Sequence, residues 1–134
     1  MTVRTPETLM LIVESDIVLV RREVKAWAVD IGFGLVDQTK LVTACSELAR
    51  NTIIYGGGGS VTLEQIEDFP RRGLRLTFED RGPGIANLDL ALSDGYTTGG
   101  GMGLGLSGAR RLSNEFDIVT APGEGTRVTI ARWR

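Results

Sequence analysis

The sequence predicts an α/β fold, a two-layer α/β sandwich in which helices cover one face of a largely antiparallel sheet. Segments with strand and helix periodicity follow one another in the order β-α-α-β-β-loop-α-β-β. Consecutive strands are joined by short polar turns, which is typical of antiparallel neighbours. A chain of 134 residues with 42% hydrophobic content suits one globular core and is too small for two, so we expect one domain over residues 1–134.

The first two elements are a strand and a helix. Residues Glu7 to Glu14 are expected to form a strand, because they contain the unbroken apolar run Leu9–Val13. Ser15 or Asp16 can cap the helix that follows, and Gly32 and Gly34 end its pattern. Its apolar residues recur at helical spacing: Ile17, Val20, Val24, Trp27, Ala28 and Ile31.

A second helix is expected from Asp37, as its cap, to about Tyr55. Four consecutive glycines, residues 56–59, stop it. Its apolar stripe consists of Leu41, Ala44, Cys45, Leu48, Thr52 and Tyr55.

The C-terminal half contains four strand-like runs and one short helix. Ser60–Ile66 and Leu74–Glu79 are predicted to form an antiparallel pair. A glycine-rich stretch then leads into a helix with Leu106, Ala109, Leu112 and Phe116 on one side. Two closing strands flank the turn at residues 121–125: Asp117–Thr120 and Arg127–Trp133.

Composition excludes several classes of function. The formal charge of −2 argues against a nucleic-acid partner. No apolar run reaches the length of a signal-peptide core or a membrane span, so no membrane association is expected. The single Cys45 suits a reducing compartment, and we expect a soluble, cytoplasmic protein. Histidine is absent, which removes histidine-based metal sites, Ser-His-Asp triads and a phospho-accepting histidine.

Three elements carry candidate chemistry. Glu47 and Asn51 are four residues apart and share a helix face at the edge of the apolar stripe, as pocket-lining residues or as a routine exposed pair. Asp80-Arg81-Gly82-Pro83-Gly84 follows a strand. It is either a hydrogen-bond acceptor beside a backbone that a flat ligand can approach, or a plain turn. The glycine-rich residues 99–106 immediately precede a helix. They are either a phosphate-binding loop or a flexible lid.

Together the three elements resemble the GHKL family of ATP-binding domains, which includes histidine kinases, gyrase and Hsp90. Glu47-Leu48-Ala49-Arg50-Asn51 is similar to the family's N box, and Asp80–Gly84 to its first glycine box. Gly101-Met102-Gly103-Leu104-Gly105 is similar to the second glycine box, and Gly125-Thr126 to the last adenine-pocket motif. The motifs occur in the family's order over roughly the whole chain, so the resemblance implies the GHKL (Bergerat) fold and ATP as the ligand.

The resemblance also implies a role for each matched residue. Asp80 would accept a hydrogen bond from the adenine amine, and Thr126 would complete the polar side of that pocket. Asn51 would hold Mg²⁺, and Glu47 would act as the general base. The glycines would contact the nucleotide, Gly82 and Gly84 at the base and Gly101, Gly103 and Gly105 at the phosphates.

Within the family, the short segment 85–98 and Asp94-Gly95-Tyr96-Thr97-Thr98 resemble small serine/threonine switch kinases of stressosome-type stress signalling. Such kinases phosphorylate STAS-domain scaffold or antagonist proteins and then activate a PP2C-type phosphatase. A homodimer of this chain is a further expectation. Two alternatives stay open. One is an anti-sigma factor with kinase activity toward a STAS anti-anti-sigma factor, and the other is an ATP-driven switch without phosphoryl transfer.

The segment between the two glycine boxes lacks a basic residue for the γ-phosphate. Residues 85–102 contain no Lys or Arg. Arg50, Arg110 or Arg111 could supply this contact instead, and the sequence does not select among them.

Overall fold

The computed structural model describes residues 4–93 and 105–134. Within these residues, five strands form one antiparallel sheet with the order β1-β2-β3-β5-β4. The strands are β1 (Glu7–Leu11), β2 (Gly59–Asp68), β3 (Arg71–Asp80), β4 (Glu115–Thr120) and β5 (Thr126–Trp133).

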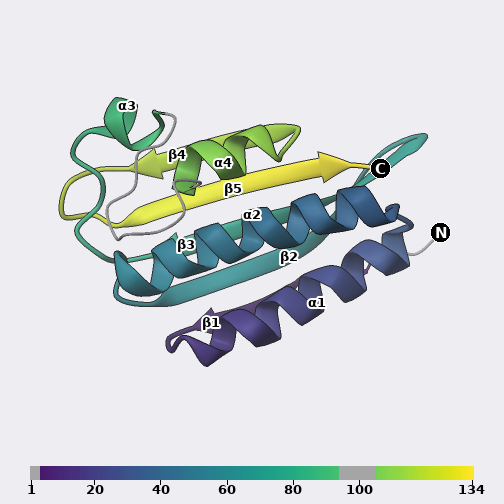
Figure 1. Ribbon diagram of the computed structural model, residues 1–134, viewed down its shortest axis with the longest axis horizontal. Helices are drawn as coiled ribbons and strands as arrows, with labels where there is room; N and C mark the ends of the chain where they lie inside the picture. Colours follow the sequence, from purple (N-terminus) through teal and green to yellow (C-terminus); the bar gives the residue numbers. More distant parts are fainter. Residues whose placement is uncertain (1–3, 94–104) are drawn as a thin grey trace.

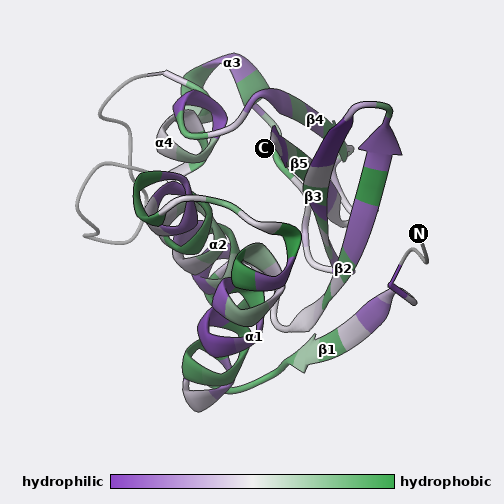
Figure 2. Ribbon diagram, turned by 90° about the vertical axis from the view of Figure 1, so that its right-hand side faces the viewer, coloured by the Kyte–Doolittle hydropathy of each residue, from purple (hydrophilic) through white to green (hydrophobic). Residues whose placement is uncertain are grey.

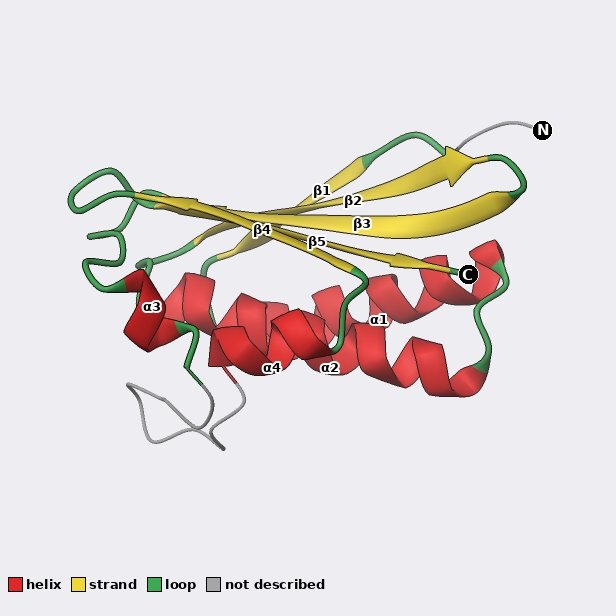
Figure 3. Cartoon of the chain, turned by 90° about the horizontal axis from the view of Figure 1, so that it is seen from above, coloured by secondary structure: helices red, strands yellow, loops and turns green. Residues whose placement is uncertain are grey.

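The helices all lie on one face of this sheet (Figure 3). They are α1 (Ser15–Ile31), α2 (Leu35–Ile54), α3 (Leu88–Ala91) and α4 (Gly105–Arg111). The long α1 and α2 lie side by side in front of the strands in Figure 1, and α4 packs beside α2. This arrangement confirms the predicted two-layer sandwich. Among the described residues, no helix combines the length and the apolar character needed to cross a bilayer.

The core lies between the helical layer and the sheet, which Figure 2 shows side by side, and it contains the apolar stripes that the sequence predicts. Trp27, Leu48 and Phe78 are among its largest members, and each is at most 2% exposed. Full burial of such a side chain stabilises the fold by roughly 1.5–3 kcal/mol. Cys45 is fully buried, and burial raises the pKa of its thiol to about 12, so this residue is an inert part of the core. Tyr55, expected in the stripe, is 39% exposed because α2 ends one residue before it.

Both predicted helix caps are wrong. Glu14 occupies the N-cap position of α1 without a side-chain bond. Asp16 Oδ2 instead accepts hydrogen bonds from the Ile12 and Val13 N–H groups, at 2.9 and 3.0 Å. The second helix begins at Leu35, two residues before the predicted cap Asp37. The Asp37 carboxylate has a tertiary partner instead of a capping role, because it forms an ion pair with Arg132 of β5 at 2.8 Å.

Two further differences concern the segment around α4. Phe116 belongs to β4 rather than to the short helix, because it lies opposite Ile130 of β5 and packs against the core. The single-turn helix α3 was not expected from the sequence. It begins after Asn87, whose Oδ1 accepts a hydrogen bond from the Leu90 N–H at 3.0 Å.

Candidate nucleotide-binding site

The C-terminal ends of α2 and β3 and the start of β5 meet at one end of the molecule (Figure 1). In the sheet, Asp80 at the end of β3 lies opposite Gly59 of β2 and Thr126 of β5. Thr126 in turn lies opposite Thr120, the last residue of β4. The antiparallel register therefore brings Asp80 and Thr126 together as cross-strand neighbours, although they are distant in the sequence.

The Asp80 carboxylate is half-buried at this junction. Its Oδ1 accepts a hydrogen bond from the Gly82 N–H at 2.9 Å. No other residue in 4–93 or 105–134 donates a hydrogen bond to this carboxylate. Its second oxygen, which lies next to Gly56, therefore keeps its acceptor capacity among the described residues.

Gly82 and Gly56 allow the loop after β3 to pack directly on the end of α2. A Cβ added to Gly82 would lie 2.7 Å from the Gly56 Cα. A Cβ added to Gly56 would lie 2.6 Å from Asp80 Oδ2. Both distances are shorter than side chains tolerate, so the close approach requires glycine at both positions. From the sequence Gly56 was only part of a helix stop, and no sequence signal distinguished it from its three glycine neighbours.

Gly84 closes the other side of the loop. Its φ is +74°, and a Cβ there would collide with the Ala121 carbonyl oxygen in the β4–β5 turn. The Gly123 N–H donates to the Pro83 carbonyl at 2.7 Å, which fastens the loop to the same turn. Gly84 is therefore held by the turn that immediately precedes Thr126.

Thr120 is a polar residue of the site that sequence reasoning missed. Its Oγ1 accepts a hydrogen bond from the Ile85 N–H at 2.9 Å and lies 2.9 Å from Thr126 Oγ1. The two threonines thus form a hydroxyl pair beside Asp80. A pair of threonines flanking the turn at 121–125 was the available signal.

Glu47 and Asn51 lie on consecutive turns of α2, and both are half-buried. The Asn51 carbonyl accepts the Gly56 N–H at 3.1 Å, which connects this helix end to the glycine next to Asp80. Within the described part of the chain, neither the Glu47 carboxylate nor the Asn51 side-chain amide forms a hydrogen bond or an ion pair. Both groups are thus available to a ligand along one face of the helix.

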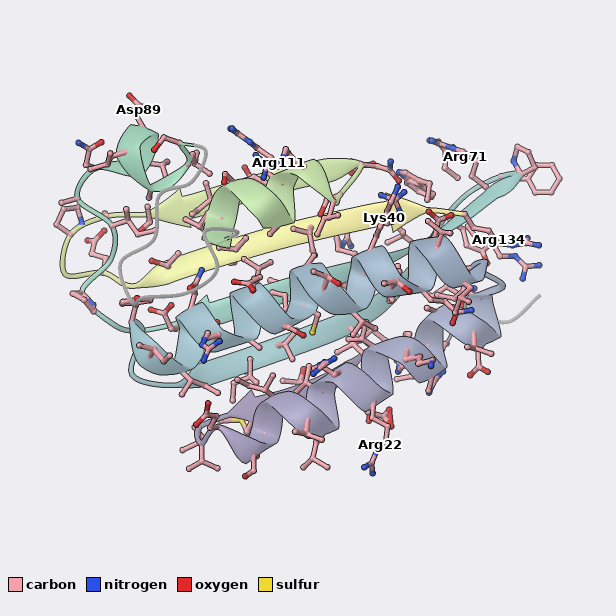
Figure 4. All side chains as sticks on the ribbon, viewed as in Figure 1. Arg22, Lys40, Arg71, Asp89, Arg111 and Arg134 are labelled. Atoms are coloured by element: carbon pink, nitrogen blue, oxygen red, sulfur yellow. The ribbon has the colours of Figure 1, made fainter. Side chains whose placement is uncertain are left out.

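Of the three glycines predicted to contact the phosphates, only Gly105 lies within the described residues. Gly105 is the first residue of α4 and has a φ of +42°. Gly101, Gly103 and Asp94–Thr98 lie outside the described residues. Of the three candidate arginines, Arg50 is 4.0 Å from Glu14, Arg110 donates to the Leu92 carbonyl at 3.4 Å, and Arg111 lies on α4 (Figure 4).

The residues fit an adenine nucleotide. Asp80 offers an acceptor oxygen that has no donor among the described residues, and the neighbouring Thr120 and Thr126 hydroxyls supply further polar groups. The described residues contain no group of three or more His, Cys, Asp or Glu side chains placed to bind a metal ion. The Asn51 amide, unpaired among the described residues, is of a chemistry that could serve a Mg²⁺ ion whose other ligands are phosphate oxygens and water.

Comparison with known proteins identifies the class. Residues 36–134 match the family described as histidine kinase-, DNA gyrase B- and HSP90-like ATPase. The fold agrees with that of the RsbU and RsbW domains of a Mycobacterium tuberculosis protein, with a TM-score of 0.69 at 22% identity over 98% of this chain and 33% of that longer one. It also agrees with that of the mycobacterial sensor histidine kinase MprB, with a TM-score of 0.57 at 20% identity over 96% of this chain and 97% of the other. The chain belongs to this ATPase family, also called GHKL.

Its place within the family follows from the curated relatives. The chain is 43% identical over 120 residues to the serine/threonine-protein kinase RsbT of Bacillus subtilis (strain 168), covering 90% of each protein. It is 28% identical over 116 residues to an anti-sigma F factor of Clostridium kluyveri, covering 84% of this chain and 82% of that protein. The chain is thus a serine/threonine-protein kinase of the RsbT type.

Proposed function

We propose that this kinase transfers the γ-phosphoryl group of ATP to a serine or threonine of a STAS-domain protein and, once released, activates a PP2C-type phosphatase. The observation that best supports ATP binding is the arrangement of the Asp80 carboxylate. One of its oxygens accepts the Gly82 N–H, and the other, next to Gly56, accepts no hydrogen bond within the described residues. The similarity to RsbT supports the partner-switching role.

In this proposal the free Asp80 oxygen accepts a hydrogen bond from the exocyclic amine of adenine, which selects adenine over guanine. Gly82 and Gly84 let the base approach the backbone, and Thr126 supplies a polar contact. Gly101, Gly103 and Gly105 donate backbone N–H groups to the phosphates.

Asn51 and Glu47 serve the other end of the nucleotide. The Asn51 amide oxygen holds Mg²⁺, which neutralises phosphate charge when bound. Glu47, one helical turn earlier, takes the proton from the attacking hydroxyl as its oxygen bonds to the γ-phosphorus. The bond from the γ-phosphorus to the bridging oxygen breaks, and ADP leaves. The unpaired state of both side chains within the described residues supports these roles.

The cellular setting belongs to the same proposal. We place the kinase in the cytoplasm as one domain over residues 1–134, with self-association into a homodimer as a further property. The chemistry of the buried Cys45 thiol is compatible with a reducing compartment.

The second candidate function is an anti-sigma factor that phosphorylates a STAS antagonist. The similarity to the Clostridium kluyveri anti-sigma F factor favours retaining it. Its distinguishing property is a stable complex with a sigma factor. Co-purification of this chain with a sigma factor, but not with a PP2C-type phosphatase, would favour this candidate over the first.

The decisive experiment is phosphoryl transfer from radiolabelled ATP with Mg²⁺ to candidate STAS-domain proteins. We expect label on a serine or threonine of one of them, and no label after addition of EDTA. Nucleotide binding without transfer to any candidate would instead support an ATP switch. ADP affinity that is unchanged by EDTA would remove the metal role of Asn51.

A further inference from the structure

A groove of about 420 Å³ lies between α1 and α2, away from the nucleotide site. Its α1 wall is Val18, Arg21, Arg22 and Lys25, all exposed, whereas the core-facing residues of this helix are buried. Its α2 wall begins at Leu35 and continues for about two turns. The groove therefore opens on the outer side of the helix layer, opposite the side that packs on the sheet.

The spacing of the lining residues makes the groove straight. Positions 18, 21, 22 and 25 are related by three, four and seven residues, so they form one stripe on α1. The α2 lining residues repeat with the same spacing from Leu35 to Thr43. At 1.5 Å per residue each wall is about 10–12 Å long. Because α1 and α2 are antiparallel (Figure 1) and joined by residues 32–34, the two walls are offset, and Val18 and Leu35 lie near opposite ends of the groove. A partner helix of about four turns, roughly 20 Å, would reach from one to the other.

The walls combine positive charge with exposed apolar surface. Arg21, Arg22 and Lys25 form no ion pair with any residue in 4–93 or 105–134, and Arg22 projects away from the body of the molecule (Figure 4). Three unpaired cations on two turns contrast with the net charge of −2 of the chain. Val18 is 56% exposed and Leu35 is 71% exposed. A complementary ligand therefore carries carboxylates and apolar side chains together.

We infer that this groove is the docking site for an acidic amphipathic helix of a partner protein. Its apolar side chains would cover Val18 and Leu35, and its carboxylates would pair with Arg21, Arg22 and Lys25. A nucleic acid fits this surface less well, because phosphates would not cover the exposed valine and leucine and the whole chain is acidic.

The groove and the nucleotide site share α2 but use different parts of it. Thr43, the last lining residue, precedes Asn51 by two turns, about 12 Å along the helix axis. Asp80 lies beyond Asn51, next to Gly56, so the α2 wall of the groove does not include the adenine pocket. The choice of partners for a test rests on the proposed function: a STAS-domain protein and a PP2C-type phosphatase.

A fluorophore on Thr39→Cys reports occupation of the groove, since Thr39 is an exposed lining residue. The one native cysteine, Cys45, is fully buried and does not compete for the label. The labelled protein, saturated with Mg²⁺ and ADP, is titrated with each partner at several salt concentrations. We expect a fluorescence change whose midpoint rises with salt for at least one partner.

Two matched variants test the charge. The combination Arg21→Gln, Arg22→Gln and Lys25→Gln should weaken that partner at least about tenfold, because three ion pairs are lost. The combination Arg21→Lys, Arg22→Lys and Lys25→Arg keeps the charges and should stay within about twofold of the parent. Leu35→Asp should also weaken binding. ADP affinity, measured by calorimetry, should be unchanged in every variant.

The outcomes separate this inference from the proposed kinase function. Equal partner affinity in the parent and the glutamine variant, or no binding by the parent, would overturn the docking site even where phosphoryl transfer is intact. Loss of self-association in the glutamine variant, with partner binding retained, would assign the groove to a second copy of this chain. Absence of phosphoryl transfer from radiolabelled ATP, with partner binding in the groove retained, would count against the kinase proposal alone.

Discussion

Asp80 uses its two carboxylate oxygens differently. One accepts the Gly82 N–H, and the other, next to Gly56, is without a donor among the described residues. The same division applies to Asn51, whose carbonyl closes the end of α2 while its side-chain amide stays unpaired among the described residues. At the scale of single residues, the site is thus built from groups whose structural and ligand-facing parts are separate atoms.

Replacing Asp80 by Asn should abolish tight nucleotide binding without unfolding the protein. The Asn oxygen can still accept the Gly82 N–H, so the loop is kept, but the charge toward the ligand is lost. A hydrogen bond to a charged group is worth roughly 1.5–3 kcal/mol, which corresponds to at least about a tenfold loss of affinity. Calorimetric titration with ADP measures it, and an unchanged affinity would contradict the adenine-pocket assignment.

Replacing Glu47 by Ala should separate binding from chemistry. Glu47 is one turn from Asn51 and makes no hydrogen bond within the described residues, so its loss should leave ATP affinity and the fold intact. Phosphoryl transfer to the STAS substrate should fall by about 10²–10⁴-fold, the usual range for a general base. Transfer at the parent rate in this variant would exclude Glu47 as the base.

Among the elements, the ends of helices and strands contribute more to the site than their middles. The end of α2 contacts the end of β3 through Gly56 and Gly82, and the β4–β5 turn holds Gly84. The start of α1 is fixed in a comparable way, because the Asp16 carboxylate binds two N–H groups of the loop from β1. These junctions determine how the elements are placed relative to one another.

Gly56→Ala should disturb nucleotide binding although Gly56 carries no side chain. The new Cβ would collide with the Asp80 side chain, so the acceptor must move. ADP affinity should fall at least about tenfold. Gly34→Ala is the matched control, since a Cβ at Gly34 meets nothing within 4 Å. Equal affinities of the two variants would show that the Gly56 contact does not position Asp80.

The start of α1 should show a defined pH dependence. Hydrogen bonds from the Val13 and Ile12 N–H groups lower the pKa of Asp16 below 3.8. A lowered folded-state pKa means that the contribution of the carboxylate to stability is present above pH 3.8 and is lost as the pH falls through the folded-state pKa. Asp16→Ala should therefore lower the Tm at pH 7.

The Tm difference between Asp16→Ala and the parent should disappear only below pH 3.8. Thermal unfolding followed by circular dichroism across this pH range measures it. Glu124→Ala, in the exposed β4–β5 turn, serves as the control. A Tm difference that stays constant below pH 3.8 would contradict the role of the Asp16 carboxylate.

For the whole molecule, Arg132 connects parts of the chain that are far apart in the sequence. From β5 it binds Asp37 in the first turn of α2 at 2.8 Å and the Leu112 carbonyl after α4 at 2.8 Å. Its side chain is only 14% exposed, so this contact lies between the layers rather than on the surface. It therefore holds the sheet against two helical segments at once.

Arg132→Ala should lower the free energy of unfolding by about 2 kcal/mol, because it removes charged hydrogen bonds and leaves their partners unpaired. Urea unfolding gives this value. Arg50→Ala, which removes a 4.0 Å contact between exposed side chains, should change stability by less than about 0.5 kcal/mol. Equal effects of the two substitutions would show that the inter-layer contact contributes no more than a surface ion pair.

The differences between sequence prediction and structure have physical causes. Periodicity predicted the strands and long helices because burial on one face enforces it, as at Trp27 and Leu48. It failed at Phe116, where the pairing partner in β5 decides between helix and strand. The capping prediction for α2 failed as well, because the Asp37 side chain binds Arg132 from the other end of the chain. The roles of the site residues remain predictions.

The sequence by itself determined the order of the strands and of the helices other than α3, the layers and the family, since periodicity and the motifs Glu47–Asn51 and Asp80–Gly84 are local properties of the chain. Only the tertiary structure decided that β5 lies between β3 and β4, which puts Thr126 beside Asp80. It also decided that Gly56 contacts Gly82. Such contacts join residues that no local pattern relates, because they depend on how whole elements pack and pair.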